Sequence, residues 1–143
     1  MQSIFLLAFW TVLLSAIAVG WRAGDRDDRK AMVAILGAAI MTGVAYTVLE
    51  GRMAMTVVVM ADLALLAYIA TYALRSARHW PLWFAGFHAA GTFFTLAALA
   101  MPESLSAVPE RMAGLWSLLA LVAMMAGLLL DQRQGVASAG RES

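Results

Sequence analysis

Five long apolar stretches constrain this chain more than any other feature of its sequence. They cover residues 3–21, 31–49, 53–74, 81–101 and 112–130. A helix rises about 1.5 Å per residue and the hydrocarbon core of a bilayer is about 30 Å thick, so about 20 residues cross it as a helix. Because 63% of the residues are hydrophobic and only 13% are charged, the composition lies far from that of water-soluble domains. The sequence therefore predicts an all-α, polytopic transmembrane helical bundle with one span for each stretch.

Short connections between these stretches predict a single domain. We expect one transmembrane bundle over residues 1–133 and a small, polar, disordered cytoplasmic tail over residues 134–143. The turn at Gly51 is so tight that the second and third spans must form an antiparallel hairpin, and the short link before Trp80 joins the third span to the fourth in the same way. Residues 16–18 resemble a signal-peptide cleavage site, but no basic residue precedes the apolar run, so a membrane span is favoured over a cleaved peptide.

Basic residues are divided unequally between the two sides of the predicted bundle. One side carries Arg22, Arg26, Arg29, Lys30, Arg75, Arg78, Arg133 and Arg141, and the other carries Arg52 and Arg111. The positive-inside rule then places the N-terminus outside and the C-terminus in the cytoplasm. The formal net charge is only +1, so no overall field attracts nucleic acid, and nucleic-acid binding is not expected.

Asp62 is the one carboxylate near the centre of a predicted span. Insertion scales assign a central Asp a cost of about 2.5–3.5 kcal/mol, which the apolar residues of the span only about offset. We therefore expect Asp62 to be protonated, partnered or facing a cavity, as intramembrane acids with a function are. Its best partner is His88 on the next span, because the two residues differ in depth by about one helical turn.

Two interpretations of Asp62 and His88 stay open at the level of sequence. The favoured one is structural, an interhelical hydrogen bond that fixes which helices pack together. The other is a proton or ion site, in which Asp62 exchanges a proton and His88 tunes its acidity or accepts that proton. Haem binding is disfavoured, because the second histidine, His79, lies at the end of the span rather than opposite His88.

Two sets of small residues recur at helical spacing and predict helix-packing faces. They are Ala39, Gly43 and Thr47 on the second span, and Gly91, Thr92 and Thr95 on the fourth.

Polar and aromatic residues at the span ends favour structural roles. Asp27 or Asp28 is expected to cap the second span, in preference to a metal site built with Asp25. Trp80 and two nearby aromatic residues, Trp83 and Phe84, are expected to form an interfacial belt.

No catalytic constellation is recognisable in the chain. There is no cysteine, which removes thiolate metal sites and cysteine nucleophiles, and no serine-hydrolase elbow, zinc-binding His pair or phosphate-binding glycine loop. An enzyme and a metal site are therefore not expected, and no cofactor is indicated.

The segment from Arg75 to His88, RSARHWPLWFAGFH, together with Trp116 in the last span, resembles a group of small uncharacterised bacterial multi-pass inner-membrane proteins. The resemblance covers about the last half of the chain; it implies a multi-pass fold and no particular activity. From the short loops and small-residue faces we expect a non-enzymatic accessory or assembly component of a larger membrane complex, or a homo-oligomer. The alternative is a small proton-coupled transporter or channel that uses Asp62 and His88. Expected partners are the lipid bilayer, other membrane subunits and further copies of the chain.

Overall fold

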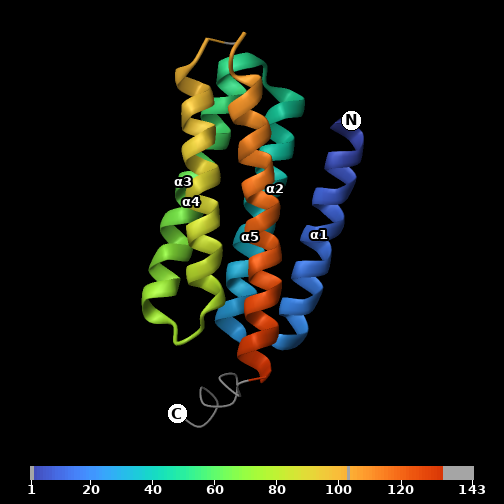
Figure 1. Ribbon diagram of the computed structural model, residues 1–143, viewed down its shortest axis with the longest axis vertical. Helices are drawn as coiled ribbons and strands as arrows, with labels where there is room; N and C mark the ends of the chain where they lie inside the picture. The colour runs from blue at the N-terminus through green and yellow to red at the C-terminus, as the bar shows by residue number, and fades with distance from the viewer. Residues whose placement is uncertain (1, 103, 134–143) are drawn as a thin grey trace.

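The computed structural model describes residues 2–102 and 104–133, and in these residues all the regular secondary structure is helix (Figure 1). The helices are α1 (Gln2–Ala23), α2 (Arg26–Val48), α3 (Gly51–Arg75), α4 (Trp80–Ala100) and α5 (Ala107–Arg133). All 5 are long and apolar enough to cross a membrane. The prediction of an all-α chain with this number of spans is confirmed, while the predicted tail over residues 134–143 lies outside the described residues.

Two helices, α2 and α5, begin about five residues before their apolar stretches do. Helix α2 begins at Arg26 because Asp25 caps it. The Asp25 side chain accepts hydrogen bonds from the backbone N–H groups of Asp27 and Asp28, both at 3.0 Å. The Asp28 side chain in turn accepts a hydrogen bond from the Asp25 backbone N–H. The expectation that Asp27 or Asp28 is the cap was wrong, because the polar first turn belongs to the helix. Helix α5 likewise includes Pro109 in its first turn, where a missing N–H leaves no bond unmade.

The helices form a ring in chain order. Each helix packs against its sequence neighbours, and α5 returns to pack against α1. The contact between α4 and α5 is the most extensive and that between α1 and α2 the least. The predicted antiparallel neighbours α2, α3 and α4 are confirmed, whereas the closure of the ring by α1 and α5 was not predicted.

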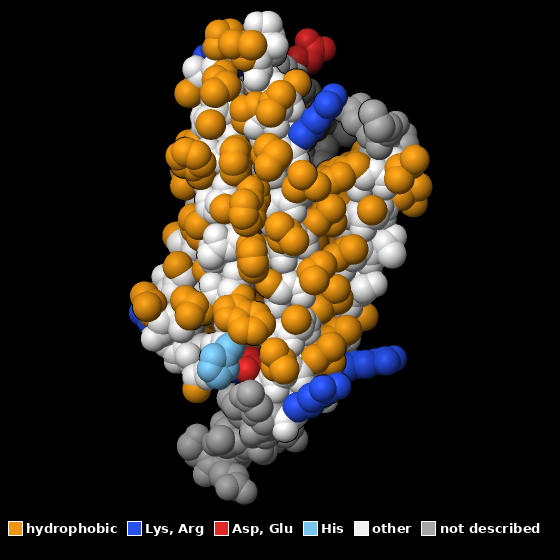
Figure 2. Space-filling view, in the orientation of Figure 1, with side chains coloured by type: hydrophobic (Ala, Val, Ile, Leu, Met, Phe, Trp, Pro, Cys, Tyr) orange, Lys and Arg blue, Asp and Glu red, His pale blue; other side chains and the backbone are white. Residues whose placement is uncertain are grey.

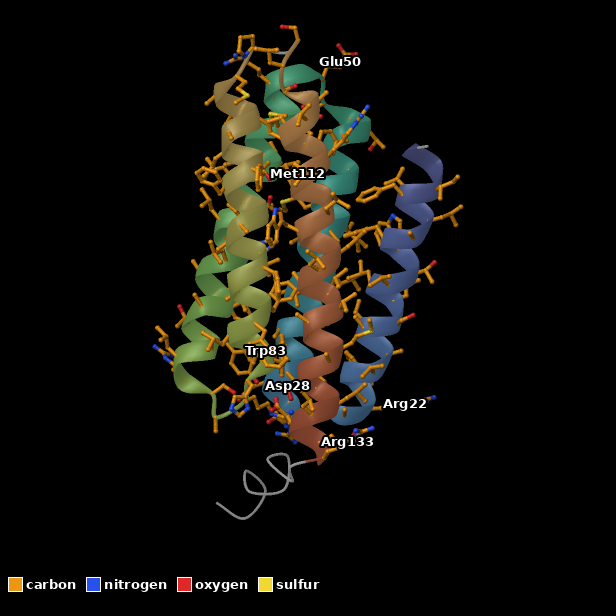
Figure 3. The ribbon with its side chains drawn as sticks, in the orientation of Figure 1. Arg22, Asp28, Glu50, Trp83, Met112 and Arg133 are labelled. Atoms are coloured by element: carbon orange, nitrogen blue, oxygen red, sulfur yellow. The ribbon has the colours of Figure 1, made fainter. Side chains whose placement is uncertain are left out.

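The two ends of the ring differ in the residues they carry. Figure 3 shows Arg22, Asp28 and Arg133 at one end, called here the Arg133 end, and Glu50 at the opposite end, called the Glu50 end. Between them, Figure 2 shows a surface covered by hydrophobic side chains, with charged side chains close to the two ends. This distribution is the one that a helical bundle needs to cross a membrane.

The tightly packed core occupies the half of the ring toward the Arg133 end. Its most deeply buried large side chains are Leu13, Met32, Ile69, Trp80, Met124 and Leu128. Close approach of α4 to α5 depends on Gly127, where an added Cβ would lie 2.5 Å from the Cβ of Trp80. The half of the ring toward the Glu50 end is packed less completely.

Candidate functional site

A cavity of about 510 Å³ lies inside the ring and is lined by residues of all the helices α1 to α5. Its volume falls in the range of about 300–1,000 Å³ that is usual for small-molecule sites. A second cavity of about 380 Å³ lies at the Glu50 end, and Tyr46 and Glu110 line both cavities.

The inner cavity opens between α1 and α2. Gly43, Tyr46 and Thr47 line it and are nevertheless exposed, as is Leu6 on α1. These residues lie in the C-terminal half of α2 and the N-terminal half of α1, the pair of neighbouring helices with the least contact. Figure 1 shows α1 diverging from the rest of the bundle toward its N-terminus. The mouth therefore faces the surroundings of the bundle, and a molecule dissolved in a bilayer could reach it sideways.

Asp62, His88 and Thr95 form a polar part of the cavity wall. The Nε2 atom of His88 lies 3.2 Å from the backbone carbonyl oxygen of Asp62. Because a carbonyl oxygen only accepts, Nε2 must carry the proton, which leaves Nδ1 of a neutral ring as an acceptor. The hydroxyl of Thr95 lies 3.4 Å from Oδ2 of Asp62 and 3.1 Å from the carbonyl oxygen of Gly91, and its single hydrogen can be donated to only one of them. Among the described residues, the Asp62 carboxylate thus has one long hydrogen bond, which Thr95 shares between it and Gly91.

Helix packing holds this wall in place. The ring of Phe84 stacks on His88 with centroids 5.5 Å apart, and Thr92 donates to the His88 carbonyl oxygen at 2.9 Å. Gly91 brings α4 close to α5, since an added Cβ would lie 3.4 Å from the Cβ of Trp116. His88 has only 7% of its surface exposed, and its ring is held by Asp62 of α3 and Phe84 of α4.

The structure brings the two residues singled out in the sequence together, but in a different way. His88 contacts the main chain of Asp62 rather than its carboxylate. A hydrogen bond that fixes α3 against α4 is therefore present, and it leaves the carboxylate available to the cavity. Whether Asp62 exchanges a proton or binds an ion stays a prediction.

The two predicted packing faces differ in their surroundings. Gly91, Thr92 and Thr95 are buried; Gly91 lies against Trp116 of α5, and Thr95 also lines the cavity. Ala39, Gly43 and Thr47 line the cavity too but are less buried, and a Cβ at Gly43 would meet no atom within 4 Å. This face of α2 is thus not packed against another helix of the same chain at Gly43, and a role in contact between chains stays a prediction.

A buried ionic cluster at the Arg133 end was missed by the sequence reasoning. Asp28 is fully buried, and its Oδ1 accepts from the hydroxyl of Tyr72 at 2.7 Å and from Nε1 of Trp80 at 2.8 Å. Its Oδ2 accepts from the Asp25 N–H at 3.0 Å and lies 2.9 Å from Nη1 of Arg78, a charge contact without hydrogen-bond alignment. The cluster ties α2, α3, α4 and the link between α3 and α4 together.

A second buried carboxylate joins α5 to the same end. Asp131 is fully buried and accepts from the backbone N–H of His79 at 3.3 Å, with Nδ1 of His79 at 3.1 Å from its other oxygen. The expectation of an interfacial belt was wrong for Trp80 and Phe84, which are buried, because Trp80 turns inward to donate to Asp28. Trp83 remains exposed as expected.

The helices define a broad class of protein, whereas comparison with known proteins identifies no family. Among residues 2–102 and 104–133 no group of three or more His, Cys, Asp or Glu side chains is arranged to hold a metal ion. The helices describe a multi-pass membrane protein with an interior cavity. No protein-family model, no curated protein and no solved structure matches the chain.

Proposed function

We propose that this chain is a small non-enzymatic membrane protein that binds a lipophilic small molecule in its inner cavity, with Asp62 and His88 in the binding wall. The observation that carries the proposal is the cavity of about 510 Å³, mostly apolar, into which a few polar groups converge. Such a combination is the usual arrangement of a small-molecule site. A lateral mouth between α1 and α2 suits a ligand that reaches the protein through the bilayer.

A purely structural role for Asp62 is less well supported by its surroundings. A residue kept only to join α3 to α4 gains most when its carboxylate is fully hydrogen-bonded and surrounded by protein, because an unsatisfied charge in an apolar interior is costly. Asp62 instead lines an open cavity and has one long hydrogen bond. The carboxylate is thus placed to meet a ligand or to exchange a proton.

Proton-coupled transport is the second candidate, and it would use the same pair of residues. The cavity lies toward the Glu50 end, while the core around Ile69, Trp80 and Met124 fills the ring toward the Arg133 end. Movement of a solute across the membrane would therefore require a second conformation in which that core opens. Binding needs only the arrangement already described, so it is the simpler proposal.

The setting of the protein remains as the sequence predicts it. We propose a bacterial inner membrane, with the Glu50 end outside and the Arg133 end in the cytoplasm, as the uneven basic residues favour. We also propose that the chain is part of a larger membrane complex or forms a homo-oligomer. Its resemblance to small bacterial inner-membrane proteins supports its membership of that group.

Native mass spectrometry of the full chain, purified gently from its native membrane, tests the binding proposal. Gly43 and Gly37 both lie on α2, and an added Cβ meets no atom within 4 Å at either position, but only Gly43 lines the cavity. Gly43→Phe should fill the cavity, whereas Gly37→Phe places the same ring on the outer surface. We expect the unmodified chain and Gly37→Phe to retain a small molecule that Gly43→Phe loses. The same retained molecules in all three proteins would contradict the proposal.

A further inference from the structure

We infer that the ligand of the inner cavity is a lipophilic organic cation, a molecule whose positive charge is carried among aromatic or alkyl groups. This inference rests on the proposed binding function and specifies the chemical class of the ligand. It is drawn from the charge and the aromatic character of the cavity wall.

All the charged residues that line the cavity are acidic. Asp62 lies in the middle of α3, Glu110 lies in the first turn of α5, and no Lys or Arg is among the described lining residues. Neither carboxylate forms an ion pair with another described residue. An ionised carboxylate in this wall repels an anion, whereas a bound cation supplies the opposite charge that favours the ionised form of Asp62 in an apolar environment.

Aromatic rings from α1, α2 and α4 also line the cavity. The rings that line the cavity are Phe5, Phe9, Trp10, Tyr46 and Phe84. The face of an aromatic ring attracts a cation, and this attraction grows when water is excluded. Rings and carboxylates in one cavity thus act on the same feature of a ligand, its positive charge, while the rings also pack against its apolar groups.

The two acids lie at different depths in the cavity. Glu110 and Tyr46 line both the cavity at the Glu50 end and the inner cavity, and Glu110 is exposed. Asp62 lies deeper, beside His88 and Thr95. Asp62 is expected to contribute more to the affinity for a cation than Glu110, because Asp62 is less accessible to water.

Two probe ions of nearly identical size and opposite charge test the inference. Tetraphenylphosphonium and tetraphenylborate are each titrated calorimetrically into the full chain in phosphatidylcholine nanodiscs, with empty nanodiscs subtracted. We expect the cation to bind at least tenfold more tightly than the anion, and Asp62→Asn to weaken binding of the cation at least tenfold. Asp62→Glu keeps the charge and should keep the preference, and Glu50→Gln, an acid outside the inner cavity, should leave it unchanged.

The outcomes separate this inference from the binding proposal itself. If both ions bind equally and Gly43→Phe blocks both, the cavity binds ligands but does not select for charge, and the inference is wrong. If neither ion binds more than it binds to empty nanodiscs, the inference is also wrong. The binding proposal is then still decided by native mass spectrometry, which shows whether Gly43→Phe loses a molecule that the unmodified chain retains. An Asp62→Asn protein that keeps the thermal midpoint of the unmodified chain and still prefers the cation overturns the role of Asp62.

Discussion

Replacement of Asp28 by Asn is expected to lower the free energy of unfolding by about 3 kcal/mol, because it breaks a buried ion pair and leaves one partner in place. Oδ1 of Asp28 accepts from Tyr72 and Trp80, while Oδ2 faces Arg78 and the Asp25 N–H. An Asn offers only one oxygen, so whichever way its amide is turned, its NH₂ group faces two donors. The remaining partner, Arg78, has a side chain only 6% exposed.

The size of the expected loss depends on the ion pair with Asp25 that Arg78 retains. Removal of one partner from a buried ion pair costs about 3–5 kcal/mol. Asp25, whose side chain is 54% exposed, stays 3.5 Å from Nη2 of Arg78 and compensates part of the charge, which places the loss near the lower limit. Replacement of both charged residues, as Asp28→Asn with Arg78→Gln, removes the uncompensated charge and should cost less than the sum of the two single changes.

Equilibrium unfolding in mixed micelles, followed by tryptophan fluorescence, measures this loss, because Trp80 belongs to the cluster. The matched control is Asp27→Asn, one residue away. Asp27 pairs with Lys30 at 2.7 Å on the surface, where the two side chains are 64% and 69% exposed. An exposed pair of this kind contributes little to stability. Equal losses for Asp28→Asn and Asp27→Asn, or a double change that costs the full sum, would refute the reasoning.

Three further predictions concern packing, orientation and assembly. Gly127→Ala should lower stability by about 1–3 kcal/mol, because its Cβ would lie 2.5 Å from that of Trp80, whereas Gly86→Ala, which meets no atom within 4 Å, should be nearly neutral in the same unfolding assay. Because the chain has no cysteine of its own, Glu50→Cys should react with a membrane-impermeant maleimide in intact spheroplasts and Arg22→Cys only after lysis; the reverse pattern contradicts the proposed orientation. Mass spectrometry of the tagged chain with a mock-tag control should recover a stoichiometric partner or a defined homo-oligomer, and a monomer alone would count against the assembly role.

The five spans and the neighbours α2, α3 and α4 follow from the sequence because both depend on local quantities. Span length is set by the thickness of a bilayer, and a tight turn such as Gly51 forces adjacent helices together. The contact of α1 with α5 does not follow, because in a bilayer apolar faces differ little from lipid and identify no partner.

The buried cluster at the Arg133 end was missed because acids near the end of a span resemble solvated caps. Asp25 and Asp27 are such residues, and Asp28 differs from them only in facing the interior. A signal was nevertheless present in the sequence, since Tyr72 near the end of the third span, Arg78 in the following link and Trp80 beside the fourth span are all donors that suit a carboxylate. The cavity could not be predicted at all, because it depends on the divergence of α1 from α2.

The most direct test of the account is to capture the ligand in the native membrane with a photoreactive residue. Trp10 lines the cavity, whereas Trp21 on the same helix is half exposed and does not. With p-benzoylphenylalanine at position 10, irradiation should attach a defined small molecule to the peptide that contains this residue, and at position 21 it should attach only bulk phospholipid. If both positions capture the same phospholipids, the space within the ring is filled by ordinary lipid and the central claim of a ligand site is contradicted.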